Sequence, residues 1–92
     1  MNTFDPEMDY VNAVPQAKKI KSSIICPIHH RKALTSFDYD NDGVNAYVTR
    51  YCCLDLAKQV SAAFLKAKIF NHVYIQNHDG TYTEVLLSSS NG

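Results

Sequence analysis

Residues 53–68 read CLDLAKQVSAAFLKAK and carry the strongest periodic pattern in the chain. Apolar side chains recur there at intervals of three and four residues, which is the spacing of one helix face: Leu56, Val60, Ala63, Phe64 and Ala67. Asp55 lies near the start of this segment and Lys66 near its end, as the helix dipole favours. The pattern predicts one amphipathic helix that packs on a sheet.

The segments on both sides of this helix alternate between apolar and polar residues, as half-buried strands do. Residues 32–40 and 44–51 flank the turn sequence NDG, and residues 70–78 and 81–87 flank DG. Asparagine, aspartate and glycine tolerate the left-handed backbone of tight turns. Two β-hairpins are therefore predicted, one before the helix and one after it.

The first third of the chain has little periodicity. Residues 1–16 contain two prolines and only acidic charges, and we expect a flexible acidic arm there. The sequence KIKSSIIC at 19–26 is rich in β-branched residues and predicts a strand that ends before Pro27. Residues 88–92, SSSNG, are expected to form a disordered tail.

These elements predict the α+β class, with a small, mostly antiparallel sheet in the order β-β-β-α-β-β and one helix on one face. A single domain is expected over residues 17–87. The chain has 92 residues, nine basic and nine acidic, so its overall charge does not indicate a strongly charged partner. No apolar run approaches the roughly 20 residues that span a bilayer, and no membrane association is expected.

Three cysteines, an odd number, follow an acidic N-terminus that does not resemble an export signal. We therefore expect a reducing, cytoplasmic setting and free thiols rather than a disulfide framework.

Cysteine and histidine lie together in ICPIHH, residues 25–30, and in YCC, residues 51–53. Cys26 and His29 have the C-x-x-H spacing of half a zinc site, since a tight turn brings both side chains to one ion. Cys52 and Cys53 are adjacent, so both reach the same ion only if the chain turns between them. The sequence predicts a metal site, with zinc as the metal, at Cys26, His29, Cys52 and Cys53.

Two other interpretations of the cysteines remain open. In the predicted strands, Cys26 shares a face with Ile24 and Cys52 shares one with Val48, which would make them inert core thiols. Alternatively, Cys53 stands where the helix lacks an ordinary N-cap residue. There the helix dipole and Arg50 would activate its thiolate for redox or transfer chemistry.

The sequence DYDNDG at 38–43 matches the start of a calcium-binding loop, D-x-D-x-D-G. The twelfth position of that loop should be glutamate but is Thr49, and the flanking segments are predicted strands. Turn formation already accounts for these residues, so we expect a hairpin rather than a calcium site.

Tyr39, Tyr47 and Tyr51 are expected on the sheet face away from the helix, close to Arg31, Lys32 and Arg50. Aromatic rings beside cations bind single-stranded nucleic acid, although tyrosine also simply favours strands. Such an aromatic face would also serve a protein partner or a homodimer.

Known catalytic motifs are absent from the sequence. The best-supported function is thus a small intracellular binding or interaction module that zinc stabilises, without catalytic machinery of its own. The alternatives are a thiol-based enzyme using Cys53, and a single-stranded nucleic-acid or anion binder using the basic stretch at 18–32.

Overall fold

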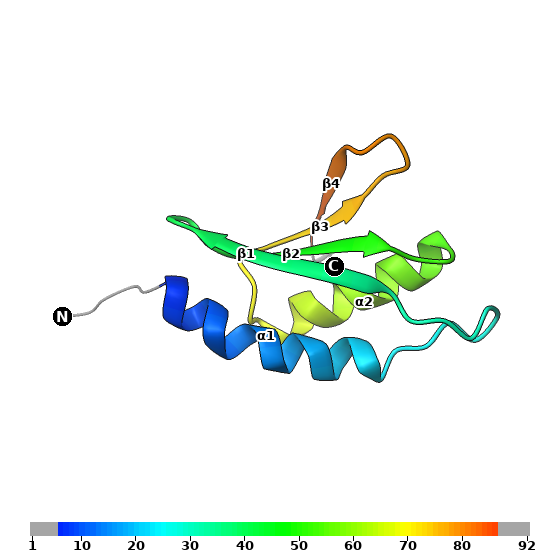
Figure 1. Ribbon diagram of the computed structural model, residues 1–92, viewed down its shortest axis with the longest axis horizontal. Coiled ribbons are helices and arrows are strands. Elements are labelled where there is room, and N and C mark those ends of the chain that lie inside the picture. The colour runs from blue at the N-terminus through cyan, green and yellow to red at the C-terminus, as the bar shows by residue number, and fades with distance from the viewer. Residues whose placement is uncertain (1–5, 87–92) are drawn as a thin grey trace, which may run out of the picture.

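The computed structural model describes residues 6–86, which form two helices and four strands (Figure 1). The elements follow in the order α1 (Pro6–Ser22), β1 (Leu34–Asp40), β2 (Gly43–Arg50), α2 (Leu54–Ala67), β3 (His72–Gln76) and β4 (Tyr82–Val85). The predicted tail at 88–92 lies outside the described residues. Within them, no helix combines the length and apolar character needed to cross a bilayer.

The four strands form one sheet in the order β1-β2-β3-β4, and both helices lie on the same side of it (Figure 1). The β1–β2 and β3–β4 pairs are antiparallel hairpins, as predicted, but β2 and β3 are parallel. The α+β class is confirmed, whereas the expected strand order and antiparallel character are only partly right. The parallel pair arises because α2 returns the chain to the end of the sheet where β2 began.

Helix α1 occupies the place of the predicted arm and first strand. Its seventeen residues extend from Pro6 to Ser22, so the strand prediction for 19–26 is wrong and the folded part begins well before residue 17. The residues of α1 and its exit that contact the core recur at helical spacing: Tyr10, Ala13, Ala17, Ile20 and Ile24.

Pro15 obscures this pattern, because proline usually interrupts a helix. Here Pro15 is exposed, and Val11, whose carbonyl loses its usual partner, is 55% exposed. Water can therefore bind that carbonyl, and the helix continues through the proline. Glu7 in the first turn and Lys21 in the last complement the helix dipole.

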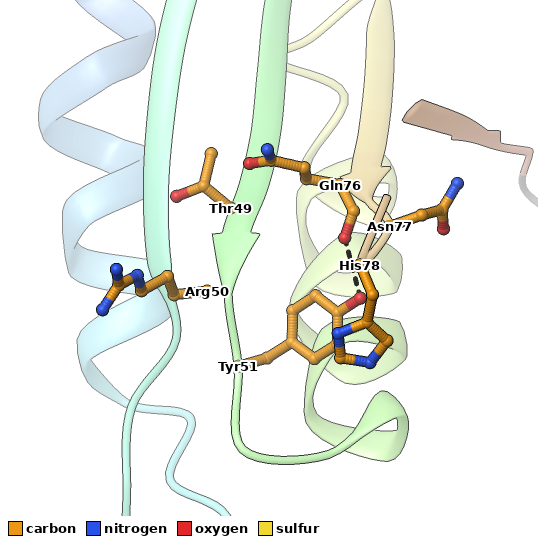
Figure 2. Close-up of a pocket in the computed structure, with 6 residues that line it drawn as sticks. All are labelled: Thr49, Arg50, Tyr51, Gln76, Asn77 and His78. Atoms are coloured by element: carbon orange, nitrogen blue, oxygen red, sulfur yellow. Dashed lines mark hydrogen bonds between the residues drawn. The ribbon is translucent and has the colours of Figure 1, made fainter. Parts of the chain in front are cut away.

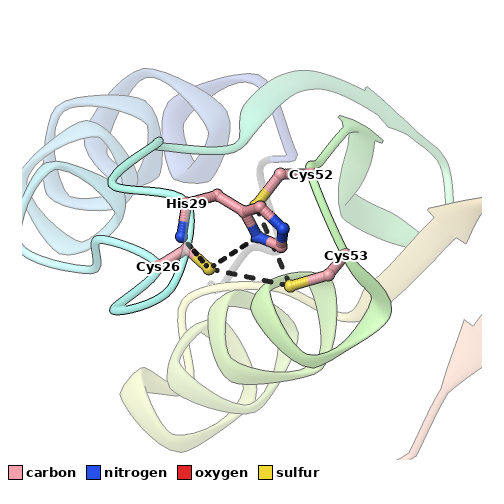
Figure 3. Close-up of side chains that lie close together, drawn as sticks. All are labelled: Cys26, His29, Cys52 and Cys53. Atoms are coloured by element: carbon pink, nitrogen blue, oxygen red, sulfur yellow. Dashed lines mark hydrogen bonds between the residues drawn. The ribbon is translucent and has the colours of Figure 1, made fainter.

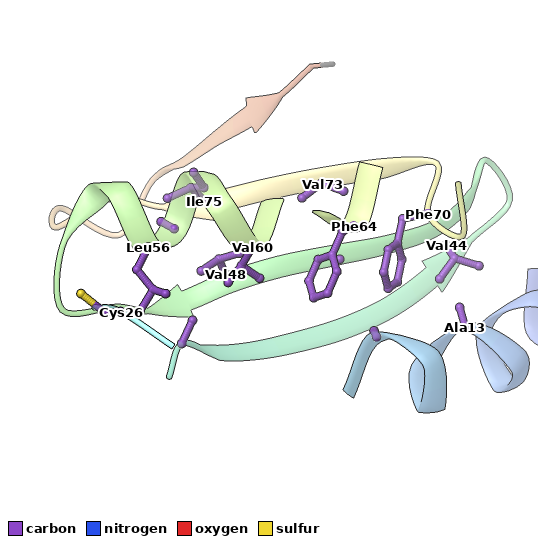
Figure 4. Close-up of a cluster of buried hydrophobic side chains, with 14 residues drawn as sticks. Ala13, Cys26, Val44, Val48, Leu56, Val60, Phe64, Phe70, Val73 and Ile75 are labelled. Atoms are coloured by element: carbon purple, nitrogen blue, oxygen red, sulfur yellow. The ribbon is translucent and has the colours of Figure 1, made fainter. Parts of the chain in front are cut away.

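The core lies between the two helices and the sheet (Figure 4). Leu56, Val60 and Phe64 of α2 are fully buried, which confirms the predicted helix and the centre of its apolar face. The Phe64 ring packs against Phe70, with ring centroids 5.2 Å apart, and Phe70 stacks on Phe37 at 5.5 Å. These contacts fix α2 across the sheet.

The opposite face of the sheet is open and carries tyrosines beside carboxylates. Tyr47 stacks on Tyr74 with centroids 5.4 Å apart, and its hydroxyl donates to the Asp38 carboxylate at 3.0 Å. Burial, followed by the Asp38 carboxylate, raises the pKa of Tyr47 to about 12. Asn45 is buried on this face and donates to both Asp38 and Asp40.

The expected grouping of Tyr39, Tyr47 and Tyr51 is wrong. Tyr39 shares the helix side of β1 with Phe37 and contacts Tyr10 of α1, with centroids 5.1 Å apart. Tyr51 follows β2 and donates its hydroxyl to the Gln76 carbonyl. The reason is strand parity, since Tyr39 pairs with Val44, whose side chain faces the core.

Candidate metal centre

The first half of the site is a closed turn after helix α1. The Cys26 N–H donates to the Arg31 carbonyl at 2.9 Å, and the His30 N–H donates to the Cys26 carbonyl at 2.8 Å. Pro27 lies inside this turn, and His30 takes the left-handed backbone with φ of 57°. The His29 N–H lies 3.4 Å from the Cys26 sulfur, so the turn directs a donor at that sulfur.

The second half is the bend between β2 and α2. Cys53 occupies the N-cap position of α2 with extended backbone, φ −157° and ψ 159°, and its side chain caps nothing. Its sulfur lies 3.8 Å from the Cys52 sulfur, so the chain does turn between these neighbours. The missing cap has an explanation, because the Cys53 side chain points to Cys26, 3.7 Å away between sulfurs.

The two halves meet in one cluster (Figure 3). The ligand atoms of Cys26, His29, Cys52 and Cys53 all lie within 4.8 Å of one another, and within the described part of the chain this is the group that could hold a metal ion. Zinc–sulfur bonds of about 2.3 Å in a tetrahedron place sulfurs about 3.8 Å apart. The two sulfur contacts at 3.7 and 3.8 Å match that edge, and the His29 Nδ1 lies 3.3 Å from the Cys26 sulfur.

The protonation of the cluster is uneven. The His29 backbone N–H, opposed by burial, lowers the pKa of Cys26 to about 6. Burial and the neighbouring sulfurs of Cys26 and Cys53 raise the pKa of Cys52 to about 11. Negative charges on sulfurs this close repel one another. A divalent metal would remove that conflict.

All four predicted ligand residues are brought together, but not in the way that strand parity suggested. Cys26 is buried in a loop after a helix, rather than on a strand. His30, the other histidine of the motif, is not part of the cluster.

The aspartates of the DYDNDG segment serve the β1–β2 hairpin. In the turn, the Asp40 carboxylate accepts a hydrogen bond from the Asp42 N–H at 2.8 Å. The carboxylates of Asp38 and Asp40 both accept hydrogen bonds from the Asn45 side-chain amide. Asp38 and Asp40 belong to β1 and Asp42 to the turn that follows it, as expected for a hairpin.

Comparisons with models of protein families, with curated proteins and with solved structures found no match to this chain.

The two adjacent histidines provide a matched test of the cluster. We expect His29→Ala to weaken zinc binding by at least about 100-fold. Loss of a residue that only hydrogen-bonds to a metal ligand already lowers metal affinity by about 10- to 100-fold, and loss of a ligand should cost more. His30→Asn keeps a residue that tolerates the left-handed backbone, and we expect it to leave zinc affinity unchanged. Competition with a chromophoric chelator measures both affinities. Equal affinities of the two variants would remove His29 from the ligand set.

Proposed function

We propose that this protein is a small binding module whose fold is stabilised by one zinc ion held by Cys26, His29, Cys52 and Cys53. The observation that carries the proposal is the convergence of four ligand atoms from two segments of the chain. Cys26 in one segment and Cys53 in the other are 27 residues apart in the sequence.

The donor set favours zinc in a structural role. Three thiolates and one imidazole make up one of the ordinary ligand sets of structural zinc sites, and four protein ligands leave no open position for a substrate. Soft thiolate donors disfavour magnesium and calcium, which prefer oxygen. The proposed role is therefore stabilisation and not catalysis.

The surroundings of the site supply a reason for a metal. Residues 24–33 contain no helix or strand, and Ile25 and Ile28 in this loop are 50% and 72% exposed. The loop reaches the core at Ile24, Cys26 and Ala33, but residues 27–32 between them are all exposed and bury little apolar surface. In a domain of this size the hydrophobic core is marginal, and the binding energy of a structural metal becomes folding energy.

The position of His29 supports a metal over inert thiols. His29 is exposed, so core packing does not force its ring toward a buried sulfur. A redox pair needs only two sulfurs, whereas here a third sulfur and an imidazole approach the same point. This convergence is the arrangement that a four-ligand metal site requires.

The direct test is metal content combined with melting. Protein purified under reducing conditions should contain one zinc per chain by elemental analysis. A strong chelator should remove the zinc and lower the midpoint of the cooperative melting transition measured by circular dichroism, and added zinc should restore it. A chain without bound metal, whose melting curve is identical with and without chelator, would contradict the proposal.

The variant Cys53→Ser tests whether Cys53 is a zinc ligand or a core thiol. Serine is a good N-cap residue, so this change should stabilise the metal-free chain by about 0.5–2 kcal/mol. In the presence of zinc the same change should destabilise the fold relative to the original protein, because one ligand is lost. Urea denaturation with and without zinc measures both effects. Stabilisation by serine under both conditions would show that Cys53 binds no metal.

A further inference from the structure

Three adjoining hollows surround Tyr51 beside the metal cluster. Figure 2 shows the residues that line one of them. Their volumes are about 410, 310 and 260 Å³, and Tyr51 lines all of them. We call them together the Tyr51 groove. Among the side chains that line it are Arg31, Lys32, Arg50, Tyr51 and His78.

The charged side chains that line the groove are basic. Arg31, Lys32 and Arg50 line one of the hollows together, and none of the residues that line the three hollows is acidic. The carboxylates of the open sheet face, Asp38 and Asp40, lie toward the β1–β2 turn, at the other end of these strands. The sheet therefore presents an acidic end and a basic end, and the metal cluster lies at the basic end.

The basic residues of the stretch at 18–32 have different surroundings in the structure. The Lys21 ammonium donates to the Ala33 carbonyl at 3.3 Å, so Lys21 holds the loop against α1. Arg31 and Lys32 are exposed and line the groove instead. They come from the metal-binding turn, whereas Arg50 comes from the end of β2.

The groove occupies a position where α/β proteins bind ligands. It lies at the carboxyl ends of the parallel strands β2 and β3 and beside the start of α2, where the chain crosses from one strand to the other. Backbone N–H groups at a helix start favour an anion there. The nearest carboxylates along the chain are Asp55, in the first turn of α2, and Asp79, which Thr81 holds through its N–H and hydroxyl.

Tyr51 provides a fixed aromatic surface. Its hydroxyl donates to the Gln76 carbonyl at 2.8 Å, which holds the half-buried ring between the ends of β2 and β3 (Figure 2). A fixed ring next to arginines is the combination that binds a base by stacking and its phosphate by charge-assisted hydrogen bonds.

We infer that the Tyr51 groove binds a nucleotide, with its phosphate at Arg31, Lys32 and Arg50 and its base against the Tyr51 ring. The nucleotide is either free or part of a single strand, since both present the same phosphate and base. The inference rests on the proposed function, because the zinc would tie the turn that carries Arg31 and Lys32 to the end of β2.

The test uses the zinc-loaded protein at low salt with three probes: a labelled single-stranded oligonucleotide, a nucleoside monophosphate and inorganic phosphate. Fluorescence anisotropy and calorimetry measure the affinities, and zinc content is determined in every sample. The oligonucleotide should bind more tightly than inorganic phosphate, and its affinity should fall as salt rises. Tight binding of the monophosphate as well would identify a free nucleotide as a ligand.

Two variants assign the binding to this groove. Arg50→Gln should weaken oligonucleotide binding by about tenfold, as expected when one charge-assisted hydrogen bond is lost. Tyr51→Leu should weaken the binding of both nucleotides but leave that of inorganic phosphate unchanged. Lys66→Gln removes the same charge near the end of α2, far from the groove, and should have no effect.

The outcomes separate this inference from the zinc proposal. Zinc-loaded protein that binds none of the probes, or that loses affinity equally with Lys66→Gln and Arg50→Gln, overturns the nucleotide site and leaves the zinc proposal standing. A chain that contains no zinc but binds the oligonucleotide through Arg50 and Tyr51 overturns the zinc proposal alone.

Discussion

The approach of the Cys26 sulfur to the Cys53 sulfur, at 3.7 Å, is the contact on which the rest of the molecule depends. It joins the loop that leaves α1 to the N-cap residue of α2, and both helices lie on one face of the sheet (Figure 1). Residues 27–32 of this loop are all exposed, so apolar burial holds only its two ends, at Ile24 and Cys26 and at Ala33. The position of Arg31 beside Arg50, and with it the Tyr51 groove, follows from the same contact.

Local stability is given up at this point of the chain. A serine or aspartate at position 53 would cap α2 and stabilise it by about 1 kcal/mol, but the residue there is a cysteine whose side chain makes no cap. Burial, followed by the neighbouring sulfurs of Cys26 and Cys53, also raises the pKa of Cys52. Both costs are understandable if a cation occupies the centre of the cluster, since a structural metal contributes more than either one. The uncapped helix and the crowded sulfurs would thus have the same explanation, a bound metal ion.

Sequence alone predicted which cysteine and histidine side chains lie close together better than it predicted the fold around them. The C-x-x-H spacing and the uncapped helix start indicated the four clustered residues, because both signals are local. Helix α1 was missed since Pro15 interrupts the pattern of Ala13 and Ala17, and only the burial of the opposite face shows why that proline is tolerated. Parallel pairing of β2 and β3 depends on contacts between distant segments that no local pattern records. The expected grouping of Tyr51 with Arg31, Lys32 and Arg50 is found, since all four line one hollow.

The central claim is that three sulfurs and one imidazole nitrogen bind a single zinc ion. X-ray absorption at the zinc edge of the purified protein tests it most directly, because the spectrum counts the ligand atoms by element and distance. The spectrum should show three sulfurs at about 2.3 Å and one nitrogen at about 2.0 Å. A zinc shell made of oxygen and nitrogen alone, or no zinc bound to the folded protein, would contradict it.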